Sequence, residues 1–100
     1  MSSATVLVHT ANAGKYLVQL CKHWSHKLDV ELGENTGVVR FGQAVASMEA
    51  GAEGLKVSIE AESDDVLERM KGVVSSHLDR FAFREAPLAF EWRQEAGSPA

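Results

Sequence analysis

Apolar residues recur at helical spacing in two stretches of the chain. In the first, over 13–28, they gather on one face when each residue turns by about 100°. The apolar positions are Ala13, Leu17, Leu20, Cys21, Trp24 and Leu28. A polar row flanks them and consists of Tyr16, Gln19, His23 and His26. The pattern predicts an amphipathic helix over 13–28.

The second helical stretch begins after Ser63, where a serine followed by two aspartates is typical of a helix N-terminus. Its apolar face comprises Val66, Met70, Val73, Val74, His77 and Phe81. Gly72 interrupts this helix at a cost of about 1 kcal/mol relative to alanine, which suggests a close packing contact. Pro87 ends the helical region.

Alternating or β-branched segments between and around these helices predict strands. They cover 4–9, 29–32, 38–41, 43–50, 55–61 and 88–92. The first segment is partly apolar on both faces, so we expect an interior strand. Glycine-containing turns separate the central segments, and Gly42 marks a bulge or tight turn.

The predicted fold class is α+β. Two one-sided helices and one-sided strands bury their apolar faces best as a two-layer sandwich, with both helices on one face of a mainly antiparallel sheet. The element order is β-α-β-β-β-β-α-β or β-α-β-β-β-α-β. We expect a single domain over 1–94 and a flexible C-terminal tail over 95–100.

Composition narrows the function. A net charge of −4 without a run of Lys or Arg argues against nucleic acid binding. The apolar runs are too short to span a membrane, and the N-terminus does not resemble a secretory signal. A single cysteine excludes an internal disulfide and fits a reducing compartment, so we predict a cytoplasmic protein.

The spacing of Cys21, His23 and His26 in the first helix resembles that of metal ligands. On a helix, however, the three side chains do not share one face. Cys21 and His23 are separated by about 200° around the helix axis, so they face different sides. His23 and His26 lie one turn apart and need a third ligand, which His77 or His9 would have to supply. A divalent metal is therefore an alternative, and no cofactor is predicted. The simpler interpretation is that His23 and His26 are ordinary half-exposed helical histidines.

His77 is unusual because it lies within an apolar stripe and needs a hydrogen-bond partner. A backbone carbonyl or Tyr16 could serve as that partner. A functional interpretation is that His77 meets His23 where the helices touch and lines a small pocket. Arg80 and Arg84 follow at one-turn intervals and could bind an anion, or could pair with surface carboxylates.

Three segments carry a family resemblance: LCKHWSHK over 20–27, HLDRFAFRE over 77–85 and LAFEW over 88–92. With the glycine-punctuated strands between them, they resemble domain-of-unknown-function family 2218, a small bacterial family. The resemblance implies a compact α+β domain without an established reaction. It also implies an association with siderophore and iron handling, with a flavin-dependent siderophore-interacting protein as a partner.

Two functions compete. The leading hypothesis is a non-enzymatic accessory or small-ligand-binding domain linked to siderophore or iron handling. The alternative is a small metal-binding or acid/base enzyme that uses His23, His26 and His77. A homodimer through a sheet edge, Phe83 or Trp92 is compatible with either. The candidate ligand-binding residues are Tyr16, Gln19, His23, His26, His77 and Arg80.

Overall fold

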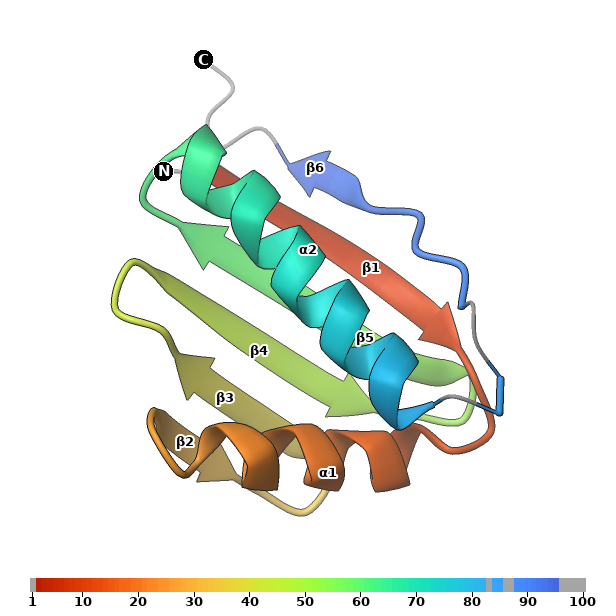
Figure 1. Cartoon of the computed structure of the whole chain (residues 1–100). Helices are drawn as coiled ribbons and strands as arrows, with labels where there is room; N and C mark the ends of the chain where they lie inside the picture. Colours follow the sequence, from red (N-terminus) through yellow and green to blue (C-terminus); the bar gives the residue numbers. More distant parts are fainter. Residues whose placement is uncertain (1, 83, 86–87, 96–100) are drawn as a thin grey trace.

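The structure, a computed structural model, describes residues 2–82, 84–85 and 88–95. Within them the chain forms two helices and six strands, in the first of the two predicted element orders (Figure 1). The helices are α1 (Ala13–Trp24) and α2 (Asp64–Phe81). The strands are β1 (Ser2–His9), β2 (Asp29–Leu32), β3 (Thr36–Arg40), β4 (Ala44–Ala50), β5 (Gly54–Ala61) and β6 (Arg93–Glu95). The predicted α+β class is confirmed.

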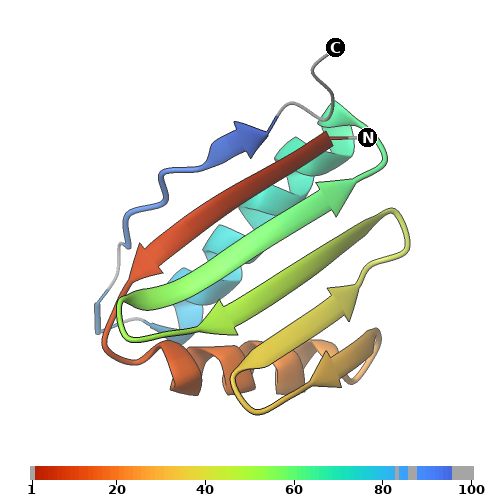
Figure 2. The ribbon, with the colours of Figure 1, turned by 180° about the vertical axis from the view of Figure 1, so that it is seen from behind.

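The strands form one antiparallel sheet in the order β2-β3-β4-β5-β1-β6. β1 pairs with β5 along its whole length and with β6 on its other side. The prediction of an interior first strand is therefore correct. Figure 2 shows the face of this sheet that no helix covers.

Both helices pack on the opposite face (Figure 1). α2 lies over β5 and β1, and α1 lies over β2 and β3. The strands alternate as a half-buried sheet requires, since every second residue points to the helices. In β5, for example, Val57 and Ile59 are fully buried while Lys56 and Glu60 are exposed.

α1 approaches β3 closely at Gly37. A Cβ built on Gly37 would lie 2.5 Å from the Cys21 Sγ and 3.0 Å from the Leu17 Cδ1. No larger residue fits beneath α1 at this point without displacing the helix. Gly72, by contrast, has no neighbouring atom within 4 Å of a built Cβ, so the predicted packing contact there is wrong.

α1 ends at Trp24, one turn earlier than predicted. The amides of Lys27 and Leu28 both donate to the Trp24 carbonyl oxygen, which closes a turn instead of continuing the helix. The Ser25 hydroxyl donates to the Lys22 carbonyl oxygen and competes with the helical pattern. His26 therefore lies in a turn rather than on the helix.

The last strand also lies further along the chain than predicted, at Arg93–Glu95 instead of 88–92. Leu88, Phe90 and Trp92 still pack against the core as partly buried residues. The Leu88 amide donates to the Asp79 carboxylate at 3.0 Å, which directs this segment away from strand pairing. Glu95, the first residue of the predicted tail at 95–100, belongs to β6 and pairs with Ser3. Phe83, Pro87 and residues 96–100 of that tail lie outside the described residues. No helix in the described part of the chain is long and apolar enough to cross a membrane.

Candidate functional site

Glu85 connects the segment after α2 to the start of α1. Its carboxylate accepts hydrogen bonds from the Thr10 hydroxyl at 2.8 and 3.0 Å and from the Asn12 Nδ2 at 3.0 Å. The Tyr16 hydroxyl donates to the same carboxylate. Asn12 occupies the N-cap position of α1 without making a side-chain cap bond, because its amide group is directed to Glu85.

The hydrogen bonds in this cluster shift the pKa values of Glu85 and Tyr16. The hydrogen bond from Tyr16, followed by those from Asn12 and Thr10, lowers the pKa of Glu85 below its usual range. The same bond to Glu85, together with burial, raises the pKa of Tyr16. Glu85 is thus held as a carboxylate and Tyr16 as a neutral phenol, the protonation states in which the phenol donates.

A cavity of about 200 Å³ opens beside Tyr16, between α1 and the C-terminal end of α2. It is lined by Lys15, Tyr16, Gln19, Phe81 and Arg84. The Gln19 Oε1 atom is buried and, among the described residues, accepts no hydrogen bond. A buried amide oxygen without a donor is costly, so it favours a ligand that brings one.

His23 and His77 meet beyond Phe81. Their ring centroids are 5.2 Å apart, and the His23 ring also contacts Phe81 at 5.6 Å. Trp24 packs against the other side of His77, with centroids 5.3 Å apart. The His77 Nδ1 atom lies 2.7 Å from the Val73 carbonyl oxygen. A backbone carbonyl, rather than Tyr16, is therefore the hydrogen-bond partner of His77.

Two pairs of the predicted site residues come together. Tyr16 and Gln19 line the cavity, and His23 and His77 form the ring pair. His26 is exposed in the turn after α1, and Arg80 is exposed and does not line the cavity. Within the described ranges, no group of three or more His, Cys, Asp or Glu side chains is arranged to hold a metal ion.

Cys21 lies on the core side of α1, as its helical position predicts. Its side chain is buried, and burial raises the pKa of its thiol. A protonated, buried thiol is a poor nucleophile and a poor metal ligand.

Two residues of the cavity, Lys15 and Phe81, were not predicted to bind a ligand, whereas Arg84 was predicted to bind an anion or to pair with surface carboxylates. Lys15 has the helical position of a solvent-facing residue, and Phe81 has that of a core residue. Glu85 was not recognised as an anchor, because its three partners lie 69 to 75 positions away in sequence. Pairing over that separation leaves no local pattern.

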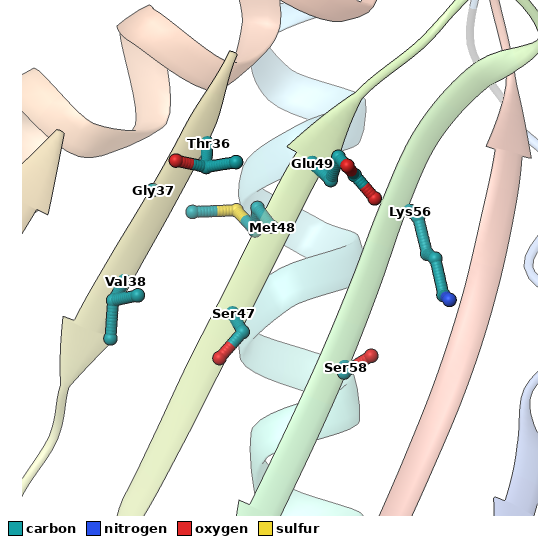
Figure 3. Close-up of a pocket in the computed structure, with 8 residues that line it drawn as sticks. All are labelled: Thr36, Gly37, Val38, Ser47, Met48, Glu49, Lys56 and Ser58. Atoms are coloured by element: carbon teal, nitrogen blue, oxygen red, sulfur yellow. The ribbon is translucent and has the colours of Figure 1, made fainter. Parts of the chain in front are cut away.

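The uncovered face of the sheet has a different character. A hollow of about 340 Å³ lies across β3, β4 and β5, and Figure 3 shows the residues that line it. They are Thr36, Gly37, Val38, Ser47, Met48, Glu49, Lys56 and Ser58. Most of these side chains are short and stand on a single sheet face, so they offer few converging polar groups to a ligand.

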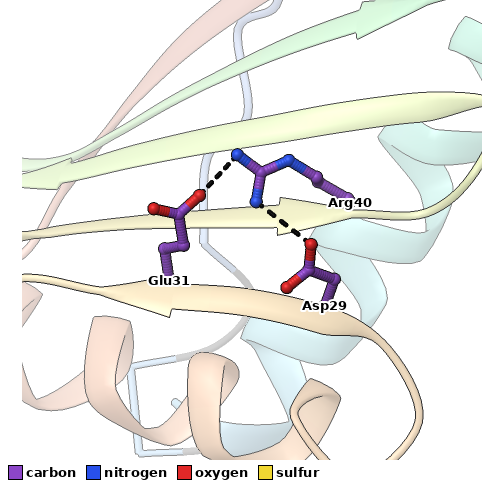
Figure 4. A network of polar contacts seen from close by, with 3 residues as sticks. All are labelled: Asp29, Glu31 and Arg40. Carbon is purple, nitrogen blue, oxygen red and sulfur yellow. Dashed lines mark hydrogen bonds and ion pairs between the residues drawn. The ribbon is translucent and has the colours of Figure 1, made fainter.

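An ion-pair network joins the edge strand β2 to β3 (Figure 4). Arg40 contacts the Asp29 carboxylate at 3.3 Å and the Glu31 carboxylate at 2.5 Å. The acids raise the pKa of Arg40, Glu31 contributing most. All three side chains are exposed, so the network supports the register of a short edge strand rather than forming a binding site.

Fold and site together define a small α+β domain in which two helices share one sheet face and enclose polar groups between them. The sequence profile described as "Uncharacterized protein conserved in bacteria (DUF2218)" matches residues 5–93. The chain belongs to this family, as its motifs predict.

A solved structure supports the same fold. The chain is similar to the protein in the "NMR structure of PA4090 from Pseudomonas aeruginosa". The two share 33% sequence identity with a TM-score of 0.80, over 93% of this chain and 96% of the other. The comparison with curated proteins finds no match.

Proposed function

We propose that this domain binds a small carboxylate that also carries a hydroxyl or amino group, in the cavity between α1 and the end of α2. The observation that carries this proposal is the buried Gln19 Oε1, which has no donor among the described residues and belongs to a cavity lined by two basic side chains.

The lining residues favour three different chemical groups on the ligand. Lys15 and Arg84 favour a negative charge. Arg84 already has an interaction within the protein, but its guanidinium carries five N–H donors and can bind a carboxylate in addition. Phe81 provides an apolar wall, and Gln19 accepts from a hydroxyl or amino group. Glu85 keeps its negative charge, but it does not line the cavity, and its oxygens accept from three donors, Thr10, Asn12 and Tyr16.

The cavity volume limits the ligand size. About 200 Å³ is smaller than the roughly 300–1,000 Å³ typical of pockets for drug-sized molecules. A hydroxylated benzoate combines the required charge, ring and hydroxyl groups at small size. Such a ring is also the chelating unit of catechol siderophores. It therefore serves as a probe for the siderophore link, which rests on the family resemblance alone and stays a prediction.

The test is a titration of the protein with 2,3-dihydroxybenzoate and, separately, with benzoate. Binding is monitored through the NMR chemical shifts of the backbone amides. We expect saturable binding of both, with dihydroxybenzoate about 3- to 10-fold tighter, the worth of one hydrogen bond. Gln19→Met keeps the side-chain length and should abolish this preference. Lys15→Ala should weaken both ligands, whereas the matched control Lys22→Ala, exposed on the same helix, should not.

Two results would contradict the proposal. One is an absence of saturable shifts around the cavity with either benzoate. The other is an equal loss of binding in Lys15→Ala and Lys22→Ala, which would indicate general charge attraction instead of a site.

The alternative, a metal-binding or acid/base enzyme that uses His23, His26 and His77, has one supporting observation, the contact between His23 and His77. An acid/base enzyme further requires a substrate beside that pair. Turnover of a small substrate that disappears in His77→Ala would favour the enzyme over a binding domain.

A further inference from the structure

The side chains of His23 and His77 join the two helices, with ring centroids 5.2 Å apart. His23 comes from the last turn of α1, and His77 comes from the second half of α2. His23 is exposed and His77 is half-buried, so solvent reaches the pair from one side. Among the described residues, no hydrogen bond occupies the ring nitrogens of His23.

The hydrogen bond of His77 fixes the nitrogen that remains available. A carbonyl oxygen only accepts, so the His77 Nδ1 must carry the hydrogen that it donates to the Val73 oxygen. In the neutral imidazole the lone pair is then on Nε2. A ring N–H bonded to a backbone carbonyl is the arrangement that orients and tautomerises metal-ligating histidines in proteins.

The ring separation allows both imidazoles to bind one ion. Zinc–nitrogen bonds of about 2.0–2.1 Å place the metal about 3.2 Å from each ring centroid, so two rings at the tetrahedral angle have centroids about 5.2 Å apart. The observed separation is 5.2 Å.

We propose that His23 and His77 form a two-histidine site for a divalent transition-metal ion that connects α1 to α2, with Zn²⁺ as the ion to test first. Two protein ligands are fewer than the three or four of most zinc sites, so this site binds more weakly than those, and water or a ligand from solution fills the remaining positions. His26, in the turn after α1, takes no part. The proposal is independent of carboxylate binding in the cavity, whose lining includes neither His23 nor His77.

Trp24 provides a reporter within the site. Its ring centroid lies 5.3 Å from that of His77 and 6.5 Å from that of His23. A paramagnetic Co²⁺ ion bound between the histidines should therefore quench its fluorescence. Trp92→Phe leaves Trp24 as the single tryptophan, so the signal reports on this position alone.

The experiment uses the full chain without a histidine tag. Zn²⁺ is titrated by calorimetry, Co²⁺ is titrated by Trp24 fluorescence in the Trp92→Phe background, and the melting temperature is followed against Zn²⁺. We expect one ion per chain, saturable quenching that Zn²⁺ reverses, and a melting temperature that rises with Zn²⁺, because an ion that binds only the folded state stabilises it.

Variants locate the ions. His23→Ala removes an exposed side chain and should fold, yet lose both the quenching and the thermal shift. His77→Gln should lose both as well. If His77→Gln is unstable, His23→Ala alone decides the test, provided that its melting temperature without Zn²⁺ equals that of the parent. His26→Ala and His9→Ala are matched controls and should behave like the parent. Equal loss in His26→Ala, binding of half an ion per chain, or no saturable binding would overturn the proposal.

Discussion

The two faces of the sheet are formed by the same strands, but their side chains have different surroundings. On the helix-covered face, alternate strand residues meet side chains from α1 and α2 and form the core. On the uncovered face, the intervening residues meet solvent and one another, as in the Arg40 network (Figure 4). The cavity beside Gln19 and the histidine pair both lie on the helical side.

This difference has a simple geometric cause. A functional site needs polar groups that converge from several directions, and a bare sheet presents its side chains in parallel. Between α1 and the region of α2, by contrast, side chains such as Tyr16 and Arg84, or His23 and His77, approach one another from different directions. The core that binds the helices to the sheet therefore also determines the site.

The largest effect should come from truncating a core residue under the helices. Ile59 of β5 is fully buried. Ile59→Ala removes its packing and leaves a cavity, so we expect a loss of about 2–5 kcal/mol in the free energy of unfolding. Urea denaturation followed by circular dichroism measures it.

The neighbouring residue provides the control for the other face. Glu60 is exposed, and Glu60→Ala should change the free energy of unfolding by no more than about 0.5 kcal/mol. Similar losses for the two variants would mean that the uncovered face is also packed, against a partner that buries it.

A second comparison uses two glycines on opposite sides of the helix layer. Gly37→Ala places a Cβ against the Cys21 Sγ beneath α1, and overpacking of this kind costs about 1–3 kcal/mol. Gly72→Ala adds a methyl group on the open side of α2 and should stabilise the protein by about 0.5–1 kcal/mol. Thermal and urea unfolding of both variants test the two signs.

A double-mutant cycle identifies the cause of the first effect. Cys21→Ala removes the atom that the new Cβ would meet, so the cost of Gly37→Ala should shrink in that background. Equal costs in both backgrounds would contradict the close approach of α1 to β3 and would indicate strain within the strand itself.

Hydrophobic periodicity was sufficient to predict the layers of this fold. The alternation of Leu55, Val57 and Ile59 and the helical stripe from Leu17 to Trp24 each report directly which face is buried. The ends of elements were harder. The end of α1 at Trp24 depends on two amides that share one carbonyl oxygen, and no single residue near it is a strong helix breaker.

The sequence predicted only those residues of the site that lie together on one helix. Tyr16, Gln19 and His23 are evenly spaced on α1, so the polar row is visible in the sequence. Which residues of α2 face that row depends on how the helices cross, and this places Phe81 and Arg84 in the cavity instead of Arg80. Glu85 is fixed by Thr10 and Tyr16, whose distance along the chain hides the contact.

The smallest effect concerns this Glu85 contact, and it depends on pH. Folding lowers the pKa of Glu85 relative to the unfolded chain, so the folded state favours the carboxylate. The resulting stability is complete above the unfolded pKa, about 4.3 for a glutamate, and is lost as pH falls through the lower folded-state pKa. Glu85→Gln should therefore be less stable than the parent at pH 7, and this difference should shrink in acid.

Urea unfolding midpoints between pH 7 and pH 3 measure the difference. Glu53→Gln, in the exposed turn between β4 and β5, is the matched control and should track the parent throughout. Tyr16→Phe removes the donor that lowers the pKa of Glu85 most, so it should reduce the acid sensitivity without removing the carboxylate. If Glu85→Gln keeps the full acid sensitivity of the parent, the carboxylate does not hold the two helices together. The positions of Tyr16 and Gln19 beside the cavity would then depend on the apolar core alone.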